Sequence, residues 1–316
     1  MADNIKRILV TGGAGFIGSH LCEALLKQGH HVICVDNFCS GSRENISHLT
    51  SHPHFEVVCH DICFPLFSEV DQIYNLASPA PQEGHADPIL TIKTNTQGPL
   101  NMLGLSKRLN IKVLQASSGT IYGDMQSSAQ KEEQWGNANP IGSHACYRET
   151  KRCAETLFFD YYRKHSCKIK IARIFPTFGP RMKCGITAYI LQALQDETLN
   201  FHEKRHQPIS LCYVDDVVEG LIALMNSDDQ IRGPINIGRP QEWTLGELAD
   251  KILEITESKS SAQFQVPTAK KELFSIPDVS LASKQLHWKP KTSLDVGLEK
   301  TIAHLKTTLN YSPRFV

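Results

Sequence analysis

The sequence predicts an α/β fold, namely a Rossmann-type doubly wound parallel sheet with a smaller, interleaved C-terminal lobe. Short apolar runs alternate with segments whose apolar residues recur at helical spacing, a pattern typical of βαβ units. A glycine-rich turn separates the first apolar run from the first helical segment. The 316 residues are 41% hydrophobic and 21% charged, which indicates a globular chain and excludes a disordered or fibrous one.

The apolar runs are expected to be the strands of the sheet, in the order Arg7 to Thr11, His31 to Val35, Phe55 to Cys59, Gln72 to Ala77, Lys112 to Ala116 and Lys168 to Ile174. Helical spacing predicts the connecting helices Phe16 to Gln28, Pro88 to Leu109 and Tyr147 to Arg163. Strands that alternate with helices in this way form parallel sheets with helices on both faces.

Beyond residue 175 the pattern loosens, because Pro176, Gly179, Pro180 and Gly185 crowd together. Helices are expected at Thr187 to Asp196 and Thr244 to Thr256, with a strand at Pro234 to Gly238. We therefore expect a Rossmann domain made of residues 1–175 with returning segments around 208–240. Residues 176–207 and 241–316 would form the substrate-binding lobe.

Charge and cysteine usage limit the classes of function. Lys and Arg number 33, and so do Asp and Glu, so no net field attracts nucleic acid. The ten cysteines contain no CxxC pair, which favours reduced thiols. No apolar run reaches membrane-spanning length and the first residues are polar. We expect a soluble cytoplasmic protein without membrane or nucleic-acid partners and without a metal site.

The turn Thr11 to Gly18 reads TGGAGFIG and fits both GxGxxG and TGxxGxxG. Glycines let the backbone turn sharply, admit a pyrophosphate without a Cβ in the way, and allow close helix packing. The following helix N-terminus supplies free N–H groups and partial positive charge. In this position between strand and helix the motif predicts a dinucleotide site.

Asp36 follows the second strand, where a carboxylate can accept both ribose hydroxyls of an adenosine. The same carboxylate would repel a 2′-phosphate, so NAD is favoured over NADP. The alternative role for Asp36 is to cap a turn.

Tyr147 and Lys151 stand four residues apart, which places both side chains on one face of a helix. A phenol with a pKa of ~10 becomes a useful base only when nearby positive charge stabilises its phenolate. Tyr147 could then take a proton from a substrate hydroxyl while hydride leaves for the cofactor. Ser117 and Ser118, at the end of the fifth strand, could hydrogen-bond that hydroxyl. The alternatives are an ordinary exposed helix face and a polar strand end.

With these motifs the sequence resembles the extended short-chain dehydrogenase/reductases, and among them the UDP-glucuronate decarboxylases. The similar stretches run nearly end to end and include RILVTGGAGFIGSHL, HDICFPLFSEVDQIYNLASPA, CYRETKRCAETL, ARIFPTFGPRM and YVDDVVEGLIALM. The resemblance implies a bound NAD that oxidises the sugar at C4. The uronate carboxylate is then β to a ketone, carbon dioxide leaves, and the ketone is re-reduced.

Carried over by position, the resemblance implies catalytic roles for Tyr147, Lys151, Ser118 and Thr120. Asp61 would meet the adenine, and Ala77 and Asn95 the middle of the cofactor. The full set of implied cofactor contacts is Gly12, Gly15, Phe16, Ile17, Gly18, Asp36, Asn37, Asp61, Ile62, Ala77, Asn95, Ser117, Tyr147 and Lys151. Implied substrate contacts are Arg173, Arg181 and Tyr213. The resemblance also implies a homodimer joined through the helices Pro88 to Leu109 and Tyr147 to Arg163.

The substrate half departs from the decarboxylase pattern. Thr120 stands where the family has glutamate, Pro176 where it has asparagine, and Ile209 where it has arginine, and the loop at 183–186 is about four residues shorter. Losing one bidentate arginine contact to a diphosphate forfeits about 1.5–3 kcal/mol. Compensating cations are available in Arg173, Arg181, Lys183, Lys204, Arg205, His206 and Arg239, unless these are solvated surface charges.

Four functions therefore stay open. The first is a nucleotide-sugar-modifying enzyme of the decarboxylase family with an altered substrate site. The second is an unaltered UDP-glucuronate decarboxylase that makes UDP-xylose, and the third is a nucleotide-sugar 4-epimerase, since Thr120 is a residue that 4-epimerases often carry. The fourth is an NAD-binding protein without turnover, against which Tyr147 and Lys151 argue.

Overall fold

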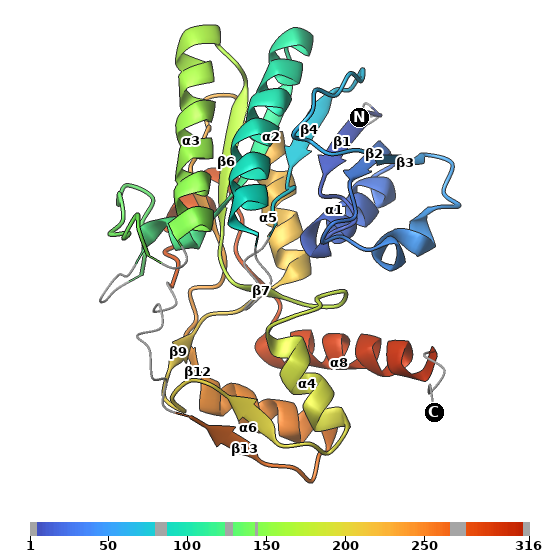
Figure 1. The fold of residues 1–316 in the computed structure, drawn as a ribbon, viewed down its shortest axis with the longest axis vertical. Helices are drawn as coiled ribbons and strands as arrows, with labels where there is room; N and C mark the ends of the chain where they lie inside the picture. The colour runs from blue at the N-terminus through green and yellow to red at the C-terminus, as the bar shows by residue number, and fades with distance from the viewer. Residues whose placement is uncertain (1–4, 80–86, 124–128, 143–144, 266–275, 312–316) are drawn as a thin grey trace.

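A parallel seven-stranded sheet forms the centre of the computed structural model, which describes residues 5–79, 87–123, 129–142, 145–265 and 276–311 (Figure 1). Its strand order is β11-β6-β5-β4-β1-β2-β3, and every neighbouring pair is parallel. The strands are β1 (Arg7–Thr11), β2 (His31–Asp36), β3 (Phe55–Cys59), β4 (Gln72–Asn75), β5 (Lys112–Ser118), β6 (Ile169–Ile174) and β11 (Ile235–Ile237). The predicted fold class is confirmed.

The strand ends differ slightly from those expected. β5 continues through Ser117 and Ser118, because these residues pair in register with Arg173 and Ile174 of β6. β4 ends at Asn75, two residues before Ala77. The late strand β11 pairs with β6 and returns the chain to the sheet edge, as the strand expected at 234–238 required.

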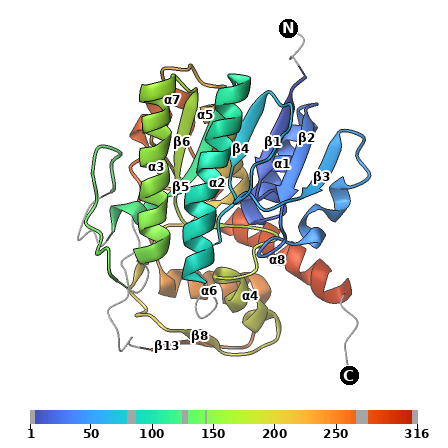
Figure 2. The ribbon, with the colours of Figure 1, turned by 45° about the horizontal axis from the view of Figure 1, so that its top comes forward.

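Helices cover both faces of the sheet, with α2 and α3 side by side on one face and α1 and α5 on the other (Figures 1 and 2). Alternate residues of a strand point to opposite faces. Accordingly Leu9 packs in the cluster that contains Met102 and Phe158, while Val10 packs in the cluster that contains Leu21. The bounds are α1 (Phe16–Lys27), α2 (Pro88–Leu109), α3 (Ala145–His165) and α5 (Val214–Asn226).

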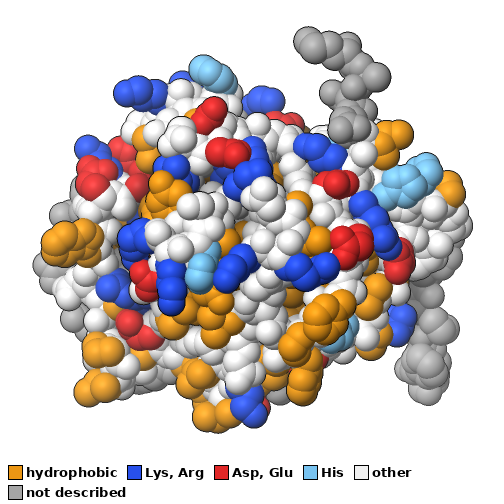
Figure 3. Space-filling view, turned by 90° about the horizontal axis from the view of Figure 1, so that it is seen from above, with side chains coloured by type: hydrophobic (Ala, Val, Ile, Leu, Met, Phe, Trp, Pro, Cys, Tyr) orange, Lys and Arg blue, Asp and Glu red, His pale blue; other side chains and the backbone are white. Residues whose placement is uncertain are grey.

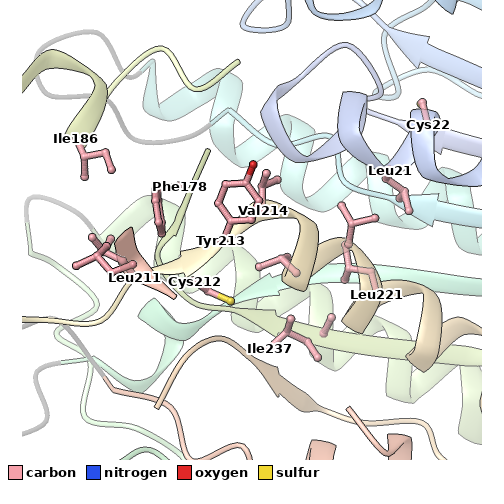
Figure 4. Close-up of a cluster of buried hydrophobic side chains, with 14 of the residues drawn as sticks. Leu21, Cys22, Phe178, Ile186, Leu211, Cys212, Tyr213, Val214, Leu221 and Ile237 are labelled. Carbon is pink, nitrogen blue, oxygen red and sulfur yellow. The ribbon is translucent and has the colours of Figure 1, made fainter. Parts of the chain in front are cut away.

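The core on the α1 and α5 side continues into the lower part of the molecule. Figure 4 shows Leu21 and Cys22 of α1 beside Leu221 of α5, with Phe178 and Tyr213 next in line. Phe178 and Tyr213 belong to the two-residue strands β7 (Thr177–Phe178) and β10 (Cys212–Tyr213), which pair with each other. The strands β7 and β10 therefore join the sheet layer to the lobe below it.

The lobe below the sheet contains α4, α6 and three short strand pairs (Figure 1). An aromatic stack of Tyr189, Phe201 and Phe264, with ring centroids 4.0 and 4.9 Å apart, packs its interior. The remaining elements are η1 (Arg43–Leu49), η2 (Gly119–Tyr122), α4 (Ile186–Leu194), β8 (Leu199–Phe201), β9 (Pro208–Ile209), β12 (Trp243–Thr244), α6 (Leu245–Thr256), β13 (Ala262–Phe264), α7 (Ser280–Leu286) and α8 (Leu294–Tyr311). Helix α7, in the C-terminal part of the chain, packs on β11 and α5 of the sheet layer. The division into domains stays a prediction.

The expected helices are present with small shifts, and α5, α7 and α8 were not predicted. α3 begins at Ala145, two residues before Tyr147. α6 begins after Thr244, whose side chain and that of Glu247 form a reciprocal capping box.

We predict that Gly18→Ala destabilises the protein, because the added Cβ would overlap the carbonyl oxygen of Gly12. Overpacking of this kind costs about 1–3 kcal/mol of unfolding free energy. Gly104→Ala in α2 is the matched control, since its Cβ would meet nothing within 4 Å. That variant should gain about 0.5–1 kcal/mol from helix propensity. Denaturant unfolding measures both, and equal stability of the two variants would contradict the prediction.

Candidate active site

The glycine turn between β1 and α1 is closed by backbone contacts. Gly12 has φ +66°, and its N–H donates to the carbonyl of Val35 at 2.8 Å. A Cβ on Gly12 would lie 2.8 Å from Cα of Ala77, so the turn sits directly against the end of β4. α1 starts at Phe16, and no side chain in the described ranges caps its N-terminus. The first N–H groups of α1 are therefore left for a ligand, as at other anion sites.

Asp36 ends β2 beside this turn and is almost fully buried, with 7% of its surface exposed. Its carboxylate accepts from the N–H of Ala14 at 3.0 Å and from that of Phe38 at 2.8 Å. Burial raises the pKa of Asp36, while these two bonds oppose the rise. The carboxylate thus caps the local backbone and also lies at the edge of the turn, and its contact with ribose hydroxyls stays a prediction.

The predicted adenine contacts follow β3. Asp61 accepts from the N–H of Cys63 at 2.9 Å. Burial favours a higher pKa, but hydrogen bonds from Cys63 and Asn37 bring the pKa of Asp61 below its usual range. Ile62 is buried under α2, where a Cβ on Gly98 would overlap its side chain. These residues lie at the carboxyl end of the strand next to β2, as the resemblance implied.

Two predicted contacts to the middle of the cofactor are Ala77, which lies two residues after β4, and Asn95, which lies two turns into α2. The N–H of Ala77 donates to the Thr11 hydroxyl at 3.2 Å. Asn95 is buried, and its Nδ2 donates to the Thr150 hydroxyl at 3.0 Å. Its Oδ1 has no hydrogen-bond partner among the described residues. A buried acceptor without a partner is costly, and a bound ligand with a donor group would satisfy it.

These features fit a dinucleotide. An uncapped helix N-terminus suits a pyrophosphate, a carboxylate at the end of β2 suits ribose hydroxyls, and the free oxygen of Asn95 suits a donor. Ser117 is the exception among the predicted contacts, because its hydroxyl donates to Glu155 at 2.6 Å and lies behind the strand end. A cofactor contact by Ser117 stays a prediction.

Tyr147 and Lys151 meet at the carboxyl end of β5. Lys151 Nζ donates to the carbonyl of Ala116 at 2.9 Å and lies 5.5 Å from the centroid of the Tyr147 ring. Burial lowers the pKa of Lys151 to about 7. Burial also raises the pKa of Tyr147, whereas the hydroxyls of Ser118 and Ser78 act to lower it. Because a phenolate and an ammonium favour each other, deprotonation of Tyr147 would return charge to Lys151.

Ser118 is oriented by its neighbour Thr120. The Ser118 oxygen accepts from the N–H of Thr120 at 3.2 Å and from its hydroxyl at 3.0 Å. With both lone pairs used, the Ser118 proton is available to donate towards Tyr147. The structure therefore brings together the four predicted catalytic residues, of which Thr120 is the most exposed.

The predicted substrate residues lie in different surroundings. Arg173 is buried in contact with Glu155, at 2.8 Å. Arg181 donates to Glu23 of α1 and lies 3.2 Å from His48. Tyr213 is buried edge-on against Phe178. Substrate contacts by Arg173, Arg181 and Tyr213 stay predictions.

The residues that depart from the decarboxylase pattern also have defined places. Ile209 is buried in β9, opposite Trp243 of β12. Among the cations considered as compensation, Arg205 pairs with Asp250 at 2.6 Å, and Arg239 donates to the carbonyl of Thr292. The exposed side chains among these cations are those of Lys183, Lys204, Arg205 and His206. Acidic and basic side chains intermingle on the face shown in Figure 3.

Glu155 and Tyr122 were missed in the sequence. Glu155 binds both Ser117 and Arg173, and the Tyr122 hydroxyl accepts from Arg173 at 2.8 Å. A signal for Glu155 was available, because it follows Lys151 by four residues and so lies on the same helix face.

The described residues contain no group of three or more His, Cys, Asp or Glu side chains that could hold a metal ion. No helix within the described ranges is long and apolar enough to cross a membrane.

Comparison with known proteins decides the family. The sequence model of the NAD dependent epimerase/dehydratase family matches residues 8–238. This chain belongs to that family. The predicted family and cofactor are confirmed, because NAD dependence is part of the family's description and the turn, Asp36 and Asn95 fit a dinucleotide.

Relatives with assigned names are UDP-glucuronic acid decarboxylases. Decarboxylase 1 of Danio rerio is 45% identical over 311 residues, which cover 97% of this chain and 74% of that protein. Decarboxylase 6 of Arabidopsis thaliana is 47% identical over 298 residues, which cover 92% and 86%. These levels of identity over most of both chains place this chain near the decarboxylase branch of the family.

Solved structures of similar fold include epimerases. The UDP-glucuronic acid 4-epimerase of Bacillus cereus, in complex with UDP-glucuronic acid and NAD, has a TM-score of 0.85 and 28% identity, covering 96% of this chain and 99% of that one. The UDP-glucose 4-epimerase of Thermotoga maritima, with UDP-glucose, has a TM-score of 0.84, 28% identity and the same coverage.

We predict that the protein binds NAD at least about tenfold more tightly than NADP, equivalent to ~1.4 kcal/mol, because the Asp36 carboxylate opposes a 2′-phosphate. Asp36→Ala should lower the ratio of NAD affinity to NADP affinity. Glu56→Ala, which removes an exposed carboxylate from β3, should leave this ratio unchanged. Calorimetric titration with both cofactors measures the ratios. Tighter NADP binding by the unmodified protein would rule out this role for Asp36.

Proposed function

We propose that the chain is an NAD-dependent enzyme that transiently oxidises C4 of the sugar in a nucleotide-sugar. The observation that carries the proposal is the convergence of Tyr147, Lys151 and Ser118 at the carboxyl end of β5. This edge of the sheet also carries the glycine turn. In open α/β sheets a ligand binds outside the carboxyl ends of the strands, so cofactor and acid–base groups would meet there.

The residues divide the chemistry between them. NAD, when bound, would accept the hydride from C4 and later return it. Tyr147 takes the proton of the C4 hydroxyl, and Ser118 donates a hydrogen bond that stabilises the phenolate. Lys151 holds its proton beside Tyr147 when the phenolate forms. The surrounding burial excludes water, which strengthens each of these interactions.

The substrate we propose is a UDP-sugar. The named relatives are UDP-glucuronic acid decarboxylases, and one similar structure holds UDP-glucuronic acid with NAD. Relative to the decarboxylase pattern, Thr120 and Ile209 replace two charged side chains in the region of the sugar and nucleotide. A β-keto acid loses carbon dioxide fastest where its developing enolate is stabilised. We therefore favour reversible C4 oxidation over efficient decarboxylation, with C4 epimerisation as the second candidate because of Thr120.

We predict that UDP-glucuronic acid labelled in its carboxyl group releases carbon dioxide far more slowly than about 1 s⁻¹, a rate within the usual enzyme range. Scintillation counting of trapped gas measures the release. Thr120→Glu together with Ile209→Arg should raise the rate. Release at about 1 s⁻¹ by the unmodified protein would instead establish an ordinary UDP-glucuronic acid decarboxylase.

The proton acceptor can be tested by following the enzyme-bound nicotinamide within one turnover. Tyr147→Phe should abolish formation of reduced nicotinamide, measured by its absorbance, while NAD affinity and thermal stability stay unchanged. Tyr161→Phe, on the same helix, is the matched control and should keep wild-type rates. Reduction of the nicotinamide at wild-type rates in Tyr147→Phe would rule out Tyr147 as the base.

We further propose a homodimer that uses α2 and α3. One face of α3 carries the apolar residues Ala154, Leu157, Phe158 and Tyr161. This stripe is in part covered, because Ala154 and Phe158 are fully buried. The support comes from α2, where Ile89, Ile92 and Leu100 remain exposed. Apolar side chains that gather on one helix face are typical of a protein interface.

A dimer is expected in sedimentation at micromolar concentration, and Ile92→Glu should shift it to a monomer, because a buried charge without a partner is costly. Val296→Glu introduces the same charge at an exposed valine of α8 and should leave the dimer intact. A monomeric unmodified protein would remove this proposal.

A cytoplasmic location is proposed from the thiols. All ten cysteines are free, with Cys22, Cys34, Cys167 and Cys212 buried. Free thiols persist in reducing compartments. Cells are quenched in acid and their protein is alkylated under denaturing conditions. Mass spectrometry should then find all ten cysteines alkylated, whereas disulfides in the native protein would contradict the assignment.

A further inference from the structure

A buried polar network lies directly behind the active-site serines. The Glu155 carboxylate accepts from the Ser117 hydroxyl at 2.6 Å, and from Nε and Nη2 of Arg173 at 3.0 and 2.8 Å. Ser117 and Arg173 face each other in the register of β5 and β6. One carboxylate from α3 therefore joins the ends of two neighbouring strands.

The other amino group of Arg173 extends the network to more distant segments. Nη1 donates to the Tyr122 hydroxyl at 2.8 Å and to the carbonyl of Glu132 at 3.0 Å. The Tyr122 hydroxyl in turn donates to Oδ1 of Asn236 in β11 at 2.8 Å. The N–H of Asn236 donates to the Glu132 carboxylate at 2.9 Å, which closes a ring of contacts.

We propose that Arg173, Glu155 and Tyr122 are positioning residues that fix the end of β5 and, through it, the Ser118 hydroxyl. This inference rests on the proposed function of Ser118 and Tyr147. Four of the five N–H groups of Arg173 already bind protein acceptors, so the guanidinium has little capacity left for a substrate phosphate or carboxylate. Arg173 thereby differs from the role that the family resemblance implied.

The hydrogen bonds of this network hold the Arg173 and Glu155 side chains in fixed positions. Arg173 is buried, and Glu155, which raises its pKa against the opposing effect of burial, pairs with it through both carboxylate oxygens. Bidentate pairs of this geometry are directional, so a small movement of either side chain breaks a hydrogen bond. Because Ser117 and Ser118 are consecutive in β5, a displacement of the strand backbone at Ser117 also displaces Ser118.

Movement of Ser118 has a consequence at Tyr147. The groups that face Tyr147 are the charged Lys151 on its own helix, Ser118 from β5 and Ser78 after β4. Loss of the Ser118 hydrogen bond removes stabilisation of the phenolate, so the pKa of Tyr147 rises. The acidic limb of the pH–rate profile would then move to higher pH.

The test is Tyr122→Phe, which deletes one oxygen of the network and keeps the ring. Tyr162→Phe on α3 is the matched control, since the Tyr162 ring also lies beneath an arginine, Arg232, at 4.0 Å and lies outside the network. Reduction of enzyme-bound NAD by UDP-glucuronic acid is followed by its absorbance within one turnover. Over a range of substrate concentrations and pH values it gives the maximal rate of hydride transfer (kcat here), the half-saturating concentration (KM here) and the pH profile. The near-ultraviolet absorbance of tyrosinate, taken as a difference against Tyr147→Phe, gives the pKa of Tyr147 without any substrate.

We expect Tyr122→Phe to lower kcat by about tenfold with KM unchanged, and to raise the pKa of Tyr147, as misplacement of a catalytic group does. Tyr162→Phe should change neither. A raised KM with unchanged kcat and pKa would overturn the inference and return Arg173 to the substrate site. Unchanged kcat, KM and pKa would overturn it too.

Two additions keep the result decisive. If Tyr122→Phe fails to fold in thermal unfolding, Ser117→Ala removes a single hydroxyl from the same network and must give the same shifts. If the unmodified protein reduces no NAD with any UDP-sugar, the proposed function fails. The substrate-free titration of Tyr147 then decides the inference alone: a raised pKa supports the network's role and an unchanged pKa overturns it.

Discussion

The absence of a side chain at Gly18 allows α1 to pack directly on the carbonyl of Gly12, and the rest of the site depends on this contact. It fixes where α1 begins and leaves the first N–H groups of the helix uncapped. The same turn brings the N–H of Ala14 to the Asp36 carboxylate, so the predicted anion site and the predicted ribose site are positioned together. The predicted cofactor site is therefore determined by the backbone of the turn rather than by a charged side chain in it.

Burial then determines what the acid–base groups can do. The pKa of Lys151 falls to about 7 and that of Tyr147 rises, because both side chains are removed from water. Each change alone would make the pair less charged, but the two charges stabilise each other once the proton leaves the phenol. Ser118, held by Thr120, provides the neutral donor that completes the arrangement. The site is thus arranged for proton removal near neutral pH.

The elements with clear periodicity were predictable, and so were the residues whose chemistry follows from spacing. The strand at Arg7 to Thr11, the glycine turn and the pair Tyr147 and Lys151 need only local patterns. The role of Arg173 could not be read in this way, because its partner Glu155 lies on α3 and the two meet only when that helix packs on the sheet. The strands β7 and β10 are two residues long, too short for any period to show.

Transfer of the C4 hydrogen tests the central claim most directly. NAD-loaded protein is mixed with UDP-glucuronic acid or UDP-glucose deuterated at C4, quenched within a single turnover, and the nicotinamide is analysed by mass spectrometry. The account predicts deuterium in the nicotinamide of the quenched cofactor, because the hydride leaves the sugar at that carbon. Conversion of either sugar without deuterium in the cofactor, or no transfer from either, would contradict it.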